Sequence, residues 1–186
     1  MNRRLAIALV HYPVLAKNGE VVTSALTNLD VHDLARSART YGCTDYFIVH
    51  PILAQRTLAT KIVSHWTHGS SAKRIPTRQE ALSLVRPVHA LDDAMSALAG
   101  AGNEQVTIWA TAARDVGKTI DFCAARRAMG EPGGPILLVF GTGWGLGPSV
   151  IAGAHAVLAP IRGPGSWNHL SVRAACAIVL DRLCAA

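Results

Sequence analysis

A glycine-rich segment in the last third of the chain has the composition of a ligand-binding loop. It spans residues 140–148, Phe-Gly-Thr-Gly-Trp-Gly-Leu-Gly-Pro, and closes the most strand-like run of the sequence, residues 136–140. Glycines at alternate positions suit a backbone that needs unusual φ angles or that a ligand approaches closely. Exposed backbone N–H groups in such a loop can hold polar atoms of a ligand. The alternative is a tight strand-to-helix turn that binds nothing.

A second segment, residues 160–171, also follows a strand-like run and reads Pro-Ile-Arg-Gly-Pro-Gly-Ser-Trp-Asn-His-Leu-Ser. Its Gly-Pro and Pro-Gly steps predict a rigid loop. In one interpretation Asn168 and Ser171 only cap the final helix. In the other, this loop packs beside the glycine-rich segment. The two then form one pocket at the carboxyl ends of parallel strands, where ligands of α/β proteins bind.

A third segment gathers charged side chains around the start of one helix. It places Asp30, His32, Asp33, Arg36 and Arg39 within ten residues. The two arginines are three positions apart, so they are neighbours on the surface of a helix. The functional interpretation is a site for a polar or anionic substrate, and the alternative is a capped helix with solvated charges.

Two nucleotide-binding patterns are incomplete in this chain. The dinucleotide pattern G-x-G-x-x-G would need a glycine at position 146, which is Leu146. Residues 112–119, Ala-Ala-Arg-Asp-Val-Gly-Lys-Thr, end like a phosphate-binding P-loop but begin with Ala112 instead of glycine. We expect this stretch to open a helix whose N-terminus faces the pocket through Thr111. A nucleotide hydrolase remains the alternative.

The elements that position these segments alternate between strands and helices. Strands are expected at residues 4–10, 45–50, 86–90, 106–110, 136–140 and 156–161. Helices are expected at residues 30–41, 53–68, 91–99 and 118–129, near Ser149, and at residues 170–183, with a loop at residues 69–71. This alternation predicts an α/β fold, a mostly parallel sheet with helices on both faces, as a single domain over residues 1–186. The last helix is apolar on more than one face, so it must be buried in the fold or against a second subunit.

Composition narrows the class of protein. Half of the residues are hydrophobic and 16% are charged, which excludes a disordered chain. The net charge of +6 favours a polyanionic partner, although a mildly basic protein without one is equally compatible. The first apolar run stops at His11-Tyr12-Pro13, which predicts a buried strand rather than a signal peptide, no membrane span and a cytoplasmic protein. The spacing of the cysteines and histidines predicts no metal site.

Together the three segments resemble the signature regions of SPOUT methyltransferases. Residues 36–42, Arg-Ser-Ala-Arg-Thr-Tyr-Gly, resemble the end of the first region. Residues 138–146, Leu-Val-Phe-Gly-Thr-Gly-Trp-Gly-Leu, resemble the second, and residues 168–175, Asn-His-Leu-Ser-Val-Arg-Ala-Ala, the third. The chain is most similar to a small bacterial family of RNA methyltransferases that share Thr-Asn-Leu-Asp, Phe-Gly-Thr-Gly-Trp-Gly-Leu and Asn-His-Leu-Ser-Val-Arg. The similarity runs from about residue 5 to the C-terminus.

This resemblance implies a trefoil knot in the last third of the chain, a homodimer, and S-adenosylmethionine as cofactor. It implies an RNA substrate, a tRNA or an rRNA, methylated on a ribose 2′-hydroxyl or a base nitrogen. The residues implied in cofactor binding are Thr111, Phe140, Gly141, Thr142, Gly143, Trp144, Gly145, Leu146, Pro160, Ile161, Arg162, Gly163, Asn168, His169, Leu170 and Ser171.

The candidate catalytic residues are Arg36, Asp30 and His32. An arginine stays protonated in proteins, so Arg36 is expected to position and stabilise the acceptor, while the general base stays unassigned. Asp30 stands where many SPOUT 2′-O-methyltransferases have asparagine, and His32 where glycine is common. These two differences leave the acceptor open between ribose and base. A non-catalytic RNA-binding module is the remaining alternative to a methyltransferase.

Overall fold

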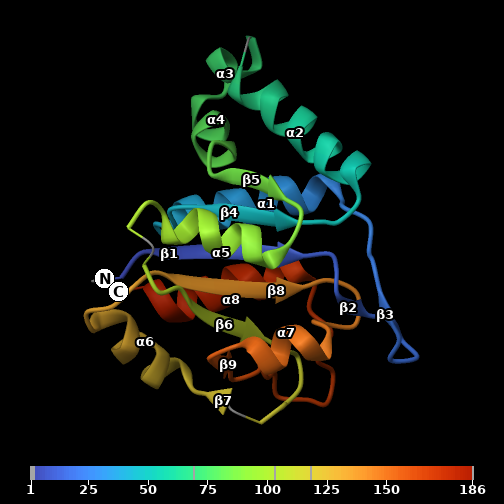
Figure 1. Cartoon of the computed structure of the whole chain (residues 1–186), viewed down its shortest axis with the longest axis vertical. Helices are drawn as coiled ribbons and strands as arrows, with labels where there is room; N and C mark the ends of the chain where they lie inside the picture. Colours follow the sequence, from blue (N-terminus) through green and yellow to red (C-terminus); the bar gives the residue numbers. More distant parts are fainter. Residues whose placement is uncertain (1–2, 69, 103, 118, 186) are drawn as a thin grey trace.

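A computed structural model describes residues 3–68, 70–102, 104–117 and 119–185 (Figure 1). Its centre is a seven-stranded sheet in the order β5-β4-β1-β8-β6-β9-β7. Every neighbouring pair in this sheet is parallel, as the sequence predicted. The strands are β1 (Leu5–Val10), β4 (Tyr46–Val49), β5 (Val85–Val88), β6 (Thr107–Thr111), β7 (Thr119–Ile120), β8 (Ile136–Gly141) and β9 (Ala156–Leu158).

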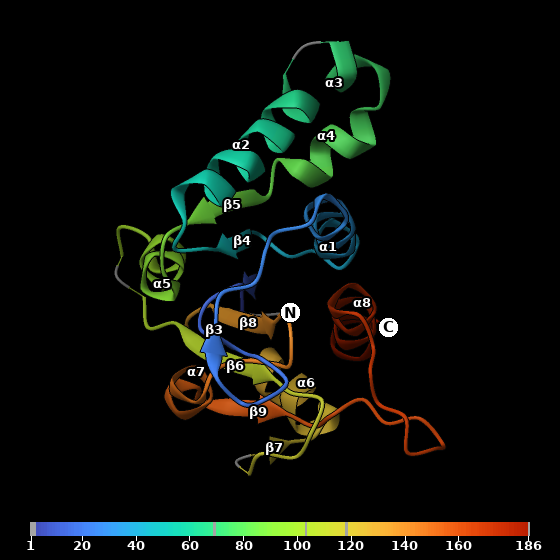
Figure 2. The same cartoon turned by 90° about the vertical axis from the view of Figure 1, so that its right-hand side faces the viewer.

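Helices cover both faces of the sheet (Figure 2). On one face lie α1 (Asn28–Thr40), α6 (Phe122–Gly130) and α8 (Val172–Cys184), and on the other α5 (Leu91–Ala99) and α7 (Pro148–Gly153). Alternate residues of β1 enter two separate cores: Ile7 and Leu9 pack with α1 and α8, whereas Ala8 and Val10 pack with α5 and α7. A strand buried on both faces must be apolar throughout, which is why β1 is a continuous aliphatic run.

Three helices at the β5 edge of the sheet form an arm, residues 53–82 (Figures 1 and 2). They are α2 (Leu53–Thr67), α3 (Ser70–Arg74) and α4 (Pro76–Leu82). The predicted loop at residues 69–71 was wrong for Ser70 and Ser71, which begin α3, whereas Gly69 lies outside the described residues. Pro76 lies in the first turn of α4, a position where proline favours a helix start.

Another correction concerns residues 118–129, which were predicted to be one helix. The structure has the strand β7 at Thr119–Ile120, and α6 begins only at Phe122. The Asp121 carboxylate caps this helix by accepting a 2.7 Å hydrogen bond from the Ala124 N–H. Lys118 lies outside the described residues. The helix start that a P-loop would require is therefore displaced.

A short antiparallel hairpin follows β1 and was missing from the sequence prediction. It consists of β2 (Val14–Leu15) and β3 (Val21–Val22). An isolated bridge joins Val14 to Leu146, so the hairpin packs on the segment that follows β8.

The order of strands also differs from the order of the chain. β8 lies between β1 and β6, and β9 lies between β6 and β7, so late strands fill positions between earlier ones. Within the described ranges, no helix has the length and apolar character needed to cross a membrane.

Candidate functional site

The loops after β6, β8 and β9 meet at one edge of the sheet, because the carboxyl ends of parallel strands share that edge. We call residues 111–117, 141–147 and 159–171 the loop cluster. The Asn168 side-chain amide donates a hydrogen bond to the Ala113 carbonyl, which ties the third loop to the first. The Trp144 and His169 rings, 6.0 Å apart, join the second loop to the third. The two segments expected to share a pocket are thus neighbours.

The second of these, residues 141–147, is called the glycine loop, and its shape depends on its glycines. Gly143 and Gly145 have φ angles of 59° and 110°, in the region that favours glycine. A Cβ at Gly143 would lie 2.9 Å from the Leu15 carbonyl oxygen, and one at Gly141 would lie 2.7 Å from the Leu146 nitrogen. The close approach that the sequence suggested is therefore made by the protein's own backbone.

The hairpin fixes the glycine loop through backbone hydrogen bonds. The Trp144 N–H donates to the Leu15 carbonyl, the Leu15 N–H to the Gly145 carbonyl, and the Gly147 N–H to the Pro13 carbonyl, each at 2.9 Å. These bonds use N–H groups that the sequence offered to a ligand. These bonds hold the glycine loop at the carboxyl edge of the sheet.

Beneath the glycine loop lies a group of polar residues, which we call the inner cluster: the buried His11 and His50 and the half-buried Ser24 and Thr142. The Ser24 hydroxyl contacts the His11 Nδ1 at 2.9 Å and also bonds to the Thr142 hydroxyl. The His50 ring stacks on His11 with 5.2 Å between centroids. Burial, together with the neighbouring His50, lowers the pKa of His11 to about 4, so this ring is neutral near pH 7. The cluster connects the ends of β1 and β4 to the glycine loop.

Asp30 joins the first signature region to the third. Its buried carboxylate accepts a 2.7 Å hydrogen bond from the Arg173 guanidinium at the start of α8 and a 2.6 Å bond from the Thr27 hydroxyl. Thr27 is the N-cap of α1 and Ser171 the N-cap of α8, so the ion pair fixes two helix starts against each other. A carboxylate paired in this way orients its neighbours.

The other two candidate catalytic residues lie on the side of α1 that faces the arm. His32 packs edge-to-face on Trp66 of α2, with 5.6 Å between centroids. Burial, with a smaller contribution from the Arg78 guanidinium, lowers the pKa of His32. Arg36 is exposed on the same helix. In the described part of the chain neither side chain has a hydrogen bond or ion pair with the loop cluster.

A cavity of about 410 Å³ adjoins the glycine loop on the α7 side. It is lined by Leu15, Arg114, Val116, Leu146, Pro148, Ile151, Ala152 and Val157. Apolar walls with one guanidinium suit a flat heterocycle that carries a negatively charged group. Thr111 makes a different contact from the one expected, because its hydroxyl donates to the Val139 carbonyl at 3.0 Å inside the sheet.

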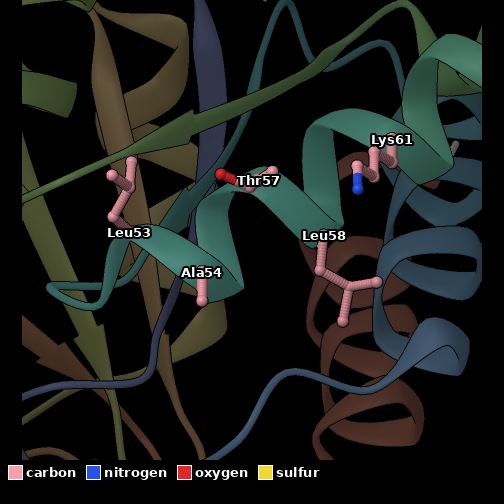
Figure 3. Close-up of a pocket in the computed structure, with 5 residues that line it drawn as sticks. All are labelled: Leu53, Ala54, Thr57, Leu58 and Lys61. Atoms are coloured by element: carbon pink, nitrogen blue, oxygen red, sulfur yellow. The ribbon is translucent and has the colours of Figure 1, made fainter.

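A hollow of about 500 Å³ lies on the arm, lined by Leu53, Ala54, Thr57, Leu58 and Lys61 (Figure 3). All five residues belong to α2, so this hollow is one helix face rather than a cleft with converging polar groups. It lacks the features of a catalytic site.

Hydrogen bonds between its own residues hold the P-loop-like stretch at 112–119. The Asp115 carboxylate accepts hydrogen bonds from the Gly117 N–H at 3.1 Å and from the Thr119 hydroxyl at 2.9 Å. Thr119 then enters strand β7. A P-loop holds phosphates at the N-terminus of the helix that follows it, and that helix start is absent at this position. The geometry therefore disfavours the nucleotide hydrolase.

The remaining predicted cofactor residues lie along the third loop. Pro160 and Ile161 are half-buried, whereas Arg162, Gly163 and Leu170 are exposed.

Sequence reasoning missed His11 and Ser24, because Ser24 meets Thr142 across 118 residues of chain. One signal was present: His11 is a polar residue at the carboxyl end of a buried strand, where ligands of α/β folds bind.

Comparison with known proteins assigns the family. A family model described as SAM-dependent RNA methyltransferase matches residues 4–185. A protein of Aquifex aeolicus is 38% identical over 183 residues, which are 98% of this chain and 89% of that protein. A protein of Oleidesulfovibrio alaskensis, named tRNA (guanine-N(1)-)-methyltransferase, is 42% identical over 181 residues, or 97% of this chain. The chain spans 42% of the length of that relative.

The fold has a counterpart among solved structures. The TrmH/SpoU tRNA modifying enzyme of A. aeolicus matches with a TM-score of 0.58 at 13% identity, covering 98% of this chain and 74% of that one. A likeness at this identity establishes the fold, and the SPOUT prediction is confirmed at that level. The described chain, matched almost from end to end by the family model, belongs to the family of SAM-dependent RNA methyltransferases.

Proposed function

We propose that this chain transfers a methyl group from S-adenosylmethionine to a tRNA or an rRNA at the loop cluster. The observation that carries the proposal is the meeting of the three signature regions in space. The Asp30–Arg173 ion pair joins the first to the third, and the Trp144–His169 contact joins the second to the third. The fold thus assembles one site from segments that lie far apart in the sequence.

The cavity beside the glycine loop fits the cofactor. Leu146, Ile151 and Val157 would pack against its adenine, and Arg114 would pair with its carboxylate. The predicted residues of the loops at 141–146, 160–163 and 168–171 would complete the binding site through their backbone groups, with the Trp144 and His169 rings outside it. When bound, S-adenosylmethionine supplies a methyl group on a positively charged sulfur. The protein's task is to align that group with the acceptor.

Arg36 and His32 would act on the acceptor. Arg36 supplies a fixed positive charge, and His32, whose lowered pKa keeps its ring neutral near pH 7, can accept a proton. Among the described residues neither forms a hydrogen bond or ion pair with the loop cluster of its own chain, which is the arrangement expected if a homodimer brings them to the loops of the partner. Exposed Leu29 on α1 and the half-buried Ile178 on α8 support a dimer through this face. Light scattering at micromolar concentration tests the dimer, and a monomer would contradict it.

The arm supports an RNA partner. Residues 53–82 contain five Lys or Arg residues and one acidic residue, Glu80, which pairs with Arg39 of α1. Lys61, Lys73 and Arg74 are exposed on this arm. Cations grouped in this way neutralise phosphates, so binding should weaken steeply as salt increases. An RNA substrate also supports a cytoplasmic location for a single methyltransferase domain. The insertion of β8 and β9 between earlier strands supports the proposal of a trefoil knot in the last third of the chain.

The direct test is transfer of tritiated methyl from the cofactor to total RNA from a strain that lacks this protein. We expect counts in the tRNA or rRNA fraction, and mass spectrometry of the digested nucleosides then distinguishes a ribose 2′-O-methyl from a base methyl. RNA binding without any methyl transfer, in the presence of bound cofactor, would favour the non-catalytic module instead.

A further inference from the structure

Two tryptophans of the loop cluster are unusually exposed. The chain has four tryptophans, of which Trp109 is buried and Trp66 packs against the Arg78 guanidinium. Trp144 and Trp167 are 56% and 79% exposed. An indole that remains in water leaves a large apolar surface available, and tryptophans are enriched where proteins meet partners.

His169 holds these two rings in one group, which we call the aromatic trio: Trp144, Trp167 and His169. Its ring lies 4.9 Å from that of Trp167 and 6.0 Å from that of Trp144, with interplanar angles of 66° and 74°. One histidine ring covers at most one face of each indole. The other face of Trp167 is therefore open to solvent, as its exposure requires.

Hydrogen bonds hold the two segments that carry the aromatic trio. Trp144 lies between Gly143 and Gly145, whose positive φ angles turn the chain outward, and its N–H is bonded to the Leu15 carbonyl. Between Trp167 and His169, the Asn168 amide is bonded to the Ala113 carbonyl. Rings fixed in this way lose little conformational entropy when a flat molecule packs on them.

The surroundings suit a nucleotide. Arg162 is exposed on the loop that also carries Trp167 and His169, where its guanidinium can meet a phosphate. Unpaired bases of RNA are recognised by stacking on aromatic side chains, and stacking tolerates any base because each has a flat face. The apolar cavity beside Leu146 already offers a place for the adenine of the cofactor, which leaves the exposed trio for the substrate.

We propose that Trp144, His169 and Trp167 form a stacking platform for an unpaired nucleobase of the RNA substrate, beside the cofactor loops. This inference rests on the proposed function, because it places the substrate at the same loop cluster. It deepens that function by naming the substrate class: RNA presented as a single strand or a loop, with the base next to the methylated nucleotide held on the platform.

The test is an RNA titration followed by fluorescence anisotropy, with S-adenosylhomocysteine present. The probes are a short unstructured RNA oligonucleotide and the same strand annealed to its complement. We expect the single strand to bind more tightly than the duplex. Trp167→Ala should weaken single-strand binding about tenfold, whereas Trp167→Phe should retain most of it, because a phenyl ring still stacks. Val21→Ala, which shortens an exposed side chain of the hairpin, is the matched control and should bind as the wild type does.

Three results would overturn the platform: unchanged single-strand affinity in Trp167→Ala, a preference for the duplex, or loss of S-adenosylhomocysteine affinity in Trp167→Ala, which would assign the rings to the cofactor. The proposed function fails separately. If the wild type does not bind S-adenosylhomocysteine by calorimetry, the methyltransferase proposal is wrong whatever the RNA titration gives.

Discussion

The glycine loop has two unlike sides. On its inner side Thr142 bonds to Ser24 and through it to His11, all among buried strand ends. On its outer side Trp144 stands in solvent beside His169. The inner side is held by polar contacts, with the buried His11 Nε2 left without a hydrogen-bond partner among the described residues. The outer side is aromatic surface that stays 56% exposed at Trp144. The glycine loop is therefore a support that is fixed on its inner side and leaves its outer side open for ligands.

The largest effect should come from the residue at which the two sides meet. Gly143→Val places a Cβ 2.9 Å from the Leu15 carbonyl oxygen and forces a branched side chain to a φ of 59°. We expect a loss of about 3 kcal/mol in the free energy of unfolding. We also expect much weaker binding of S-adenosylhomocysteine, measured by denaturant titration and by calorimetry on the folded variant.

Gly153→Val is the matched control, because a Cβ at the end of α7 meets no atom within 4 Å and its φ is ordinary. It should stay within about 1 kcal/mol of the wild type. Equal losses in both variants would mean that the hairpin contact at Gly143 has no special role.

The inner side predicts a pH dependence. The pKa of His11 falls from 6.5 to about 4 on folding, so between these values the unfolded chain binds a proton that the folded chain does not. The contribution of His11 to the free energy of unfolding is therefore fully present above pH 6.5. It is lost as the pH falls towards 4, and the loss is about 3 kcal/mol. His11→Gln should remove that part of the decline in urea titrations at stepped pH.

His68→Gln, a change at an exposed histidine that ends α2, serves as the comparison. The stability of this variant should fall with decreasing pH as that of the wild type does. A His11→Gln protein with the wild-type decline would show that the inner cluster is not a buried neutral group.

The ion pair between Asp30 and Arg173 fixes the start of the helix that follows the third loop. It can be compared with the exposed ion pair between Arg39 and Glu80. Arg173→Met leaves the Asp30 carboxylate buried without its cation and should cost about 2 kcal/mol of stability. Arg39→Met removes an exposed partner of Glu80 and should cost less than about 0.5 kcal/mol. Thermal unfolding of the two variants under one condition checks this order, and equal shifts in Tm would contradict the supporting role of Asp30.

The smallest effect on folding is expected at Arg36. Arg36→Ala removes an exposed charge, so Tm and the affinity for S-adenosylhomocysteine should remain near those of the wild type. Methyl transfer to RNA should fall at least about tenfold, because the charge acts only on the acceptor. Unchanged transfer would make Arg36 a solvated helix charge.

The sequence predicted the fold where elements are long and strongly patterned. The runs that became β1, β8 and α5 were identified within one residue of their observed bounds. The two-residue strands β2, β3 and β7 were missed, because periodicity needs more residues than they contain. The start of α6 had a signal in its capping aspartate, Asp121, which the lysine and threonine before it obscured.

The site was predicted in part. The similarity of three segments to one family indicated which loops meet, and the structure brings those loops together. The roles of single side chains were harder to predict from the sequence, because they depend on contacts between distant residues. Asp30 was expected near the acceptor, yet its partner is Arg173, 143 positions away. The glycines were attributed to unusual φ angles or to approach by a ligand; Gly143 and Gly145 have positive φ angles, and a hairpin of the same chain approaches Gly143.

The central claim is that the loop cluster binds S-adenosylmethionine and not a nucleoside triphosphate. Calorimetric titration of the wild-type protein with S-adenosylhomocysteine, and separately with ATP and magnesium, tests it most directly. We expect saturable binding of S-adenosylhomocysteine with a matching rise in Tm, and no heat of binding for ATP. Saturable binding of ATP without binding of S-adenosylhomocysteine would contradict it.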